Sequence, residues 1–279
     1  MTEIIEKTFI VVSPASLELS NIRGSIEIRT GQDGQIHVTA SKDERSGDAS
    51  RTRIELSQEP DGSVKVATRF PDGAWSWLIG SFPCRVDYVV QAPRNCILKL
   101  NAVSSDIVAG GFEGQFSIQS VSGEISLNNL SGPASIKTVS GAIQLADLSG
   151  ELRLNTVSGK VTGMHVNGIL HLDTVSGNIS LAESNLPCID ASTVSGGMRY
   201  QTGFGAGPYR FKSVSGNVEL VVPPESSCAA ELHAISGQLS SKLPATSVER
   251  HNGSQTIQVQ GGGVQVFLQS VSGNLTLAS

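Results

Sequence analysis

The sequence is short of charge and of aromatic side chains, and both shortages narrow the choice of function. Charged residues make up 16% of the 279 positions, aromatic residues make up 5%, and the formal net charge is −5. Nucleic-acid binding needs a stripe of lysine and arginine that neutralises phosphates, and an anionic membrane surface attracts a basic patch in the same way. We therefore expect no nucleic-acid partner and no anionic membrane surface as a partner.

Long apolar runs are missing too. A membrane helix needs about 20 consecutive apolar residues, and no segment approaches that length. Residues 1–12 begin acidic and then alternate between apolar and polar, without the apolar stretch and cleavage site of an export signal. We expect no membrane insertion, and a cytoplasmic chain or a mature fragment.

What the sequence does contain is a repeated tetrapeptide of the form Thr/Ser-Val-Ser-Gly. Its first copies recur with a period of 18, and the later spacings grow to 19, 20 and 21 before a final gap of 36. That gap equals two periods, so we expect one diverged copy near Asn252 and Gly253. The copies are Ser120–Gly123, Thr138–Gly141, Thr156–Gly159, Thr174–Gly177, Thr193–Gly196, Ser213–Gly216, Ala234–Gly237 and Ser270–Gly273.

A second set of glycines lies halfway between these copies, so that a glycine recurs every nine residues through the regular part. Within each nine the apolar residues alternate with polar ones, which is the pattern of a strand with one buried face. A further apolar residue, such as Val139 or Leu148, is expected to enter the core at each corner. We expect the inward set to include Ile143, Leu145, Leu154 and Leu172, and the outward set to include Gln144, Arg153 and His171.

The two kinds of corner, Thr-Val-Ser-Gly and Leu-Ser-Gly, alternate along the chain. A corner therefore stacks on another of its own kind 18 residues away. This favours an all-β parallel β-solenoid, similar to a β-helix or β-roll, with about 18 residues and two strands per turn and about 4.8 Å of height per rung. An antiparallel meander of nine-residue hairpins stays open as the alternative.

The first part of the chain is less regular. We expect residues 1–95 to form an irregular N-terminal β region that caps the solenoid, and residues 96–279 to form the repeat solenoid, in one continuous structural unit. The dipeptides Asp33-Gly34 and Asp61-Gly62 each lie between alternating runs and predict hairpin turns.

The four cysteines show no spacing typical of zinc or redox sites. Cys96, Cys188 and Cys228 share a column of the predicted solenoid, at rungs one, six and eight. Two rungs separate Cys188 from Cys228 by about 9–10 Å, beyond the ~7 Å limit between Cα atoms for a disulfide. We expect these thiols to be free.

One column of the predicted solenoid brings titratable groups together. Asp147, His165 and Glu183 are each one period apart and follow Asn129 in the same column, so an imidazole would stack between two carboxylates. Such a group suits a metal or general acid/base site. The alternative, which we favour because no third ligand or pocket converges on it, is a solvated corner whose carboxylates keep His165 protonated.

The other candidates for chemistry are weaker. Asp106 and Glu124 are also one rung apart, near the spacing of a retaining glycosidase pair, but no aromatic groove accompanies them. The serine and threonine ladders lack a partnered histidine and aspartate, and the Ser-Gly corners lack the aspartate of calcium-binding β-rolls. We expect no enzyme activity, no metal and no cofactor.

One apolar segment interrupts the strand pattern. Residues 70–83 hold both tryptophans of the chain, and Trp75, Trp77, Leu78 and Phe82 are its candidate binding residues. Such a loop is either a binding surface for a partner or ligand or a plug for the open N-terminal end of the core. We favour the plug and keep the four residues as binding candidates.

The C-terminal part predicts a different kind of contact. From His251 to Ser279 the chain contains no lysine, arginine, aspartate or glutamate, yet its sequence pattern predicts strands. Natural sheet edges are usually blunted by charge, proline or a covering element. We therefore expect this end of the solenoid to be covered by the chain's own loop or by a second copy, which would make self-association through the solenoid end a contact of the protein.

The serial Val-Ser-Gly corners, together with the strands in 86–93, 217–223 and 262–268, are similar to the bacterial putative-adhesin family, a β-strand-repeat domain of unknown function. The resemblance covers roughly residues 84 to 279. It implies the fold more than a function: the family has no defined catalytic residues, some members are linked to cell-envelope stress, and many relatives are exported, which would place the chain at the cell envelope or surface.

From these observations we expect a non-catalytic adhesin-like or scaffold protein that presents a repetitive β-solenoid surface to a protein partner. Two alternatives stay open: a polysaccharide-active parallel β-helix enzyme, favoured by a groove with clustered carboxylates and aromatics, and a self-polymerising cytoskeletal scaffold, favoured by a bare solenoid end. A carbohydrate ligand has no specific support in the sequence.

Overall fold

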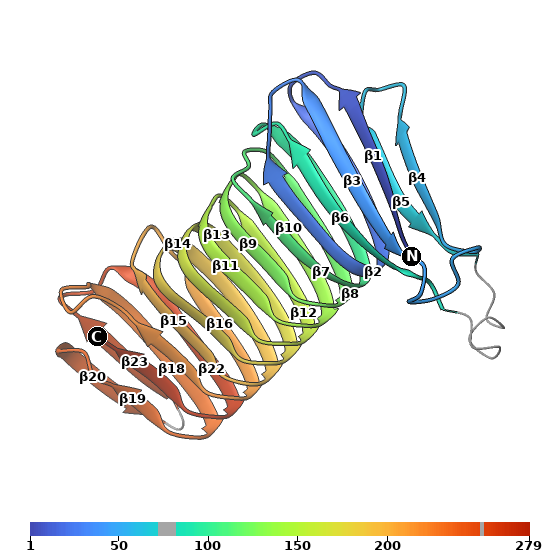
Figure 1. The fold of residues 1–279 in the computed structure, drawn as a ribbon. Helices are drawn as coiled ribbons and strands as arrows, with labels where there is room; N and C mark the ends of the chain where they lie inside the picture. The colour runs from blue at the N-terminus through green and yellow to red at the C-terminus, as the bar shows by residue number, and fades with distance from the viewer. Residues whose placement is uncertain (72–81, 252–253) are drawn as a thin grey trace. The chain divides into compact units, whose positions relative to one another are not determined.

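The protein is all-β. Its structure, a computed structural model, describes residues 1–71, 82–251 and 254–279, and these contain strands, turns and bends but no helix. The chain divides into two compact units, residues 1–141 and 142–279. Within each unit the strands stack as successive turns of a β-solenoid-like coil (Figure 1).

The first unit combines antiparallel and parallel pairing. β2 is a long bent strand that pairs in parallel with three others, with β5 through its first half, with β6 through its second half and with β7 along most of its length. The strands described in this unit are β1 (Thr2–Ile10), β2 (Ala15–Thr30), β3 (Gln35–Asp43), β4 (Arg53–Gln58), β5 (Val64–Arg69), β6 (Arg85–Ala92), β7 (Cys96–Gly110), β8 (Phe116–Ser122), β9 (Ile125–Ser131) and β10 (Ala134–Ser140).

The two predicted hairpin turns have different outcomes. Asp61-Gly62 joins β4 and β5, which pair antiparallel, so the hairpin predicted there is confirmed. Asp33-Gly34 is a turn, but the strands on either side of it do not pair: β3 is antiparallel to β1 and to β6. The prediction of a hairpin at Asp33-Gly34 was wrong, because β2 is already flanked by parallel neighbours along its length.

The repeats of the first unit stack in parallel with a register of 18. Leu98 lies beside Phe116 on the next turn, and Phe116 lies beside Ala134 on the turn after it. The other half of the turn follows the same register, with Ile107 beside Ile125. The side chains of all five are buried and form part of the core.

The second unit continues the same pattern in its first turns. β13 and β14 each run round a corner, so one half of the strand stacks in one sheet and the other half in the next. The strands described in this unit are β11 (Ile143–Ser149), β12 (Leu152–Ser158), β13 (Val161–Ser176), β14 (Ile179–Ser195), β15 (Met198–Gly203), β16 (Tyr209–Ser215), β17 (Val218–Val221), β18 (Cys228–Ser236), β19 (Leu239–Ser241), β20 (Ala245–His251), β21 (Ser254–Val259), β22 (Val264–Ser272) and β23 (Leu275–Ala278).

The predicted inward and outward sets are confirmed here. The inward set is 1–3% exposed, whereas Gln144 and Arg153 are exposed and His171 is half-buried. The alternation therefore fixes which face of each strand enters the core, as expected for a period of two. The inward set consists of Ile143, Leu145, Leu154 and Leu172.

The order of the last strands differs from the sequence order. β22 lies between β16 and β18 and pairs in parallel with both, and β23 lies in the same way between β17 and β19. β21 and β20 then form an antiparallel hairpin on the other side of β18. The last strands of the chain are thus interior rungs, visible in Figure 1 as β22 beside β16.

Two predictions are corrected by this order. The long gap before the last repeat does not hold a diverged solenoid copy, because residues 245–259 run antiparallel; Asn252 and Gly253 themselves lie outside the described residues. The charge-free C-terminal strands were also expected at the end of the stack. They need no blunting charge, because β22 and β23 are hydrogen-bonded on both sides.

The inserted rung also changes the spacing of the cysteines. All four are free, and β16 and β22 both lie between Cys188 on β14 and Cys228 on β18. Three strand-to-strand steps therefore separate the two thiols, whereas counting copies along the sequence predicted two. Burial raises the pKa of the Cys96 thiol to about 12 and that of Cys228 to about 11, which disfavours the thiolate.

Candidate functional site

The binding candidates predicted from sequence lie mostly outside the described residues. Trp75, Trp77 and Leu78 fall in 72–81, so neither their predicted role in binding nor the plug is tested. Phe82 is described, and its side chain is 50% exposed. The backbone carbonyl of Phe82 accepts a hydrogen bond of 2.8 Å from the backbone N–H of Asp48, which anchors the end of this segment.

The column of titratable groups forms as predicted. His165 Nδ1 lies 3.0 Å from Asp147 Oδ1, and His165 Nε2 lies 3.1 Å from Glu183 Oε2. The backbone φ angles of Asp147, His165 and Glu183 are 55°, 53° and 48°, respectively, so each residue makes the left-handed bend of its rung. The side chains are 49–63% exposed. Among the described residues no group of three histidine, cysteine, aspartate or glutamate side chains is arranged to hold a metal ion.

The ion pairs of this column predict a pH-dependent stability. Hydrogen bonds with Glu183 and then Asp147 raise the pKa of His165 above 6.5 in the folded state. The stabilisation is therefore complete below pH 6.5 and is lost as the pH rises through the raised pKa. We expect the difference in urea midpoint between wild type and His165→Asn to shrink between pH 5 and pH 8. Asparagine tolerates the left-handed bend, as Asn129 does at φ 48°. A difference that stays constant across this range would contradict the prediction.

The second pair of carboxylates, Asp106 and Glu124, lies on neighbouring rungs. Asp106 Oδ1 accepts a hydrogen bond of 2.8 Å from the backbone N–H of Glu124 on the next rung. Asn178, Asn217 and Asn274 accept the same type of bond from the next rung in the second unit. Asp106 therefore has a structural function at the corner, which it shares with these asparagines.

The valine of each Val-Ser-Gly corner points outward, which sequence reasoning missed. Val139 is 48% exposed, whereas Leu148 at the other kind of corner is buried as predicted. Thr138 turns inward in its place, and its hydroxyl donates to the backbone carbonyl of Ser140. In the second unit the register stacks six such side chains on consecutive rungs, with exposed fractions of 46–48% for the valines and 74% for the isoleucine. This valine ladder consists of Val157, Val175, Val194, Val214, Val271 and Ile235.

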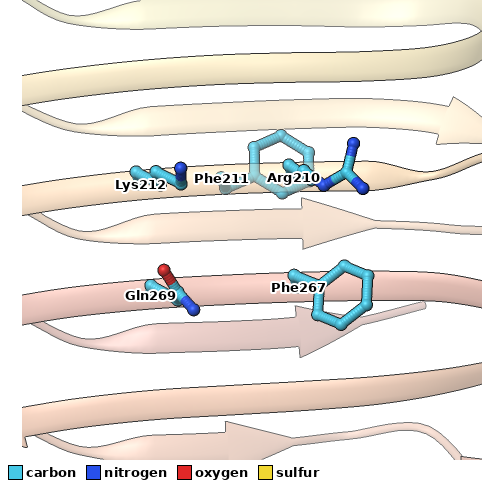
Figure 2. A pocket seen from close by; sticks show the side chains of 5 residues that line it. All are labelled: Arg210, Phe211, Lys212, Phe267 and Gln269. Carbon is cyan, nitrogen blue, oxygen red and sulfur yellow. The ribbon is translucent and has the colours of Figure 1, made fainter.

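A shallow depression lies on the outward face of β16 and β22 (Figure 2). Arg210 and Lys212 project from β16, and Phe267 and Gln269 project from the neighbouring β22, where they lie beside the two cations in register. The depression has a volume of about 320 Å³, and the buried Phe211 lies beneath it. The Arg210 guanidinium lies over the Phe267 ring, 5.9 Å from its centroid.

Sequence reasoning had no means of finding this depression. Arg210 and Phe267 lie far apart in the chain and belong to copies that are not neighbours in the sequence. They meet only because β22 inserts beside β16. The one available signal was Phe267 itself, an aromatic residue at a position where the alternation of β22 places an outward side chain.

These features define a class of protein, an all-β repeat protein of β-solenoid-like fold whose outward side chains stack into ladders. The described residues contain no helix with the length and apolar character needed to cross a bilayer. The chain belongs to the family described as Toastrack DUF4097, whose family model matches residues 15–278. The resemblance to the bacterial putative adhesins is confirmed.

A solved structure gives the same picture of the fold. A putative adhesin from Parabacteroides distasonis is 11% identical, with 99% of this chain and 97% of that chain covered and a TM-score of 0.53. A putative lipid binding protein from the same organism is 12% identical over 98% of this chain and 96% of that chain, with a TM-score of 0.47. A putative adhesin from Parabacteroides merdae is 9% identical over 99% of this chain and 97% of that chain, with a TM-score of 0.36. A comparison with curated proteins gave no match.

Proposed function

We propose that the protein is a non-catalytic, adhesin-like interaction protein, built as a parallel β-solenoid with two strands in each turn of the repeat, and that the valine ladder is its contact surface. The observation that supports this proposal is the ladder itself. Six consecutive rungs present an aliphatic side chain to solvent at the same corner. Isolated exposed apolar residues are common, but a contiguous apolar stripe is typical of an interaction surface.

The partner that best fits the ladder is a second copy of this chain. The side chains recur at the strand spacing of about 4.8 Å, so a partner with the same spacing can place its own valines between them, as identical side chains interdigitate between paired sheets. The ladder has no charged member, and the neighbouring corner residues are serines such as Ser176, Ser195 and Ser215. Two copies therefore meet without like-charge repulsion at this corner.

The test is the concentration dependence of sedimentation for the full-length chain. We expect wild type to self-associate weakly and the triple variant Val175→Gln, Val194→Gln, Val214→Gln to stay monomeric, because glutamine at three adjacent rungs removes the apolar stripe. The matched control places glutamine one residue along on the same rungs.

In that control, Ser176→Gln, Ser195→Gln, Ser215→Gln, association is expected to match wild type. A wild type that stays monomeric at millimolar concentration, or a valine variant that associates as strongly as wild type, would rule out the ladder as the contact surface.

A further inference from the structure

The depression between β16 and β22 holds two exposed cations, Arg210 and Lys212. Within the described part of the chain Arg210 and Lys212 form no ion pair, and Arg210 contacts the Phe267 ring instead. By contrast, Arg153 and Arg199 on the same unit are paired with Glu151 and Glu219. The depression thus combines two exposed positive charges, one aromatic face and the amide of Gln269.

Acidic residues border the depression on both sides. Asp190 on β14 is the register partner of Arg210, and Glu231 on β18 is the register partner of Phe267. Both carboxylates are exposed. A ligand with dense negative charge, such as a polyphosphate or a nucleic-acid strand, would meet these two carboxylates as it extended along the rungs. A ligand that places one anionic group between Arg210 and Lys212 would not.

The backbone around the depression is already paired. β16 lies between β14 and β22, and β22 lies between β16 and β18. An extended peptide binds a sheet chiefly by adding a strand to a free edge, and neither strand offers one. Recognition here depends on side chains alone, which suits a ring-shaped ligand with an apolar face and polar edges.

We propose that this depression binds one carboxylate-bearing sugar of an acidic saccharide. The apolar face of the sugar ring packs on Phe267. The carboxylate accepts hydrogen bonds from the Arg210 guanidinium and the Lys212 ammonium, which are the stronger, charge-assisted type. Gln269 exchanges hydrogen bonds with ring hydroxyls. The site shares no residue with the valine ladder, which adjoins it two positions further along β16 and β22, so its formation does not require self-association.

The test is calorimetric titration of the full-length chain with a galacturonate trisaccharide and with its methyl ester, which has the same rings without the charge. We expect the acid to bind and the ester to bind at least about tenfold more weakly, since charge-assisted bonds are about twice as strong as neutral ones. Arg210→Gln and Lys212→Gln are each expected to weaken binding of the acid about tenfold, and Phe267→Leu, which keeps apolar bulk but removes the aromatic face, several-fold.

Lys160→Gln is the matched control, because Lys160 is an exposed lysine of the same unit that lies in the connection between β12 and β13. Its affinity for the acid is expected to equal that of wild type. Three results would overturn the proposal: no binding of the acid at 10 mM, equal binding of acid and ester, or equal loss of binding in Lys160→Gln and Arg210→Gln. Binding of poly-glutamate as tight as that of the trisaccharide would also overturn it, since it would show attraction of any polyanion.

Discussion

Gly177→Ala is expected to lower the free energy of unfolding by about 4 kcal/mol or more, which is in the exceptional range for one substitution. Gly177 has φ of +145°, a region that residues with a Cβ rarely adopt. A Cβ built at this position would lie 2.0 Å from the carbonyl oxygen of Gly159 on the preceding rung. Backbone must therefore move on two rungs at once. Urea denaturation followed by circular dichroism measures the loss.

The matched control is Gly197→Ala. Gly197 also lies at a corner of the second unit, but its φ is not in the positive range, and a Cβ there would approach nothing closer than 3.6 Å, at Asn178 Oδ1. The control should leave the urea midpoint close to that of wild type, since its backbone N–H can still donate to Asn178. Equal loss of stability in both variants would show that the corner glycines are not fixed by the close approach of successive rungs.

The local features of the fold could be predicted because each is decided within a few residues. Alternation fixed the inward side of every strand tested, as Leu154 and Arg153 show. The period of the repeat placed Asp147, His165 and Glu183 in one column, and their contacts follow from that register.

The stacking order could not be predicted in the same way. A Ser-Val-Ser-Gly corner fits equally well beside any other, so the sequence of β22 does not say which rung is its neighbour. The absence of charged residues in 251–279 was interpreted as the sign of a solenoid end that must be covered. It is instead typical of strands that are paired on both sides, as β22 is. The depression at Arg210 and Phe267 depends on this order and was missed with it.

The outward valines were missed for a different reason. Both kinds of corner carry an apolar residue, and the backbone before that residue decides which side chain turns inward. At Thr138 the alternation of the strand continues, so the threonine stays at 5% exposure and Val139 faces solvent. At the other corner Asp147 has φ of 55°, and this left-handed bend breaks the alternation so that Leu148 is buried.

Removal of residues 262–279 is expected to unfold the C-terminal half of the second unit. The deletion takes out β22 and β23, which lie inside the stack, so β18 loses its parallel neighbour and the hairpin of β20 and β21 is left attached to β18 alone. Hydrogen exchange should then show that the amides of 228–236 lose their protection. If the last strands formed a terminal rung, the same deletion would leave β18 paired with β16 and its amides protected.

Engineered cysteines test the same strand order without a deletion. Ser215 and Ser272 are partners in register on β16 and β22, and adjacent strands lie about 4.8 Å apart, within the range of Cα separations that a disulfide spans. Ser215→Cys with Ser272→Cys should therefore form a disulfide on mild oxidation. Ser215→Cys with Ser236→Cys should not, because Ser272 lies between them and two strand steps exceed the ~7 Å limit. Peptide mapping by mass spectrometry distinguishes the two pairs. A 215–236 disulfide in place of 215–272 would show that the copies stack in sequence order, and the ligand depression at Arg210 and Phe267 would then not exist.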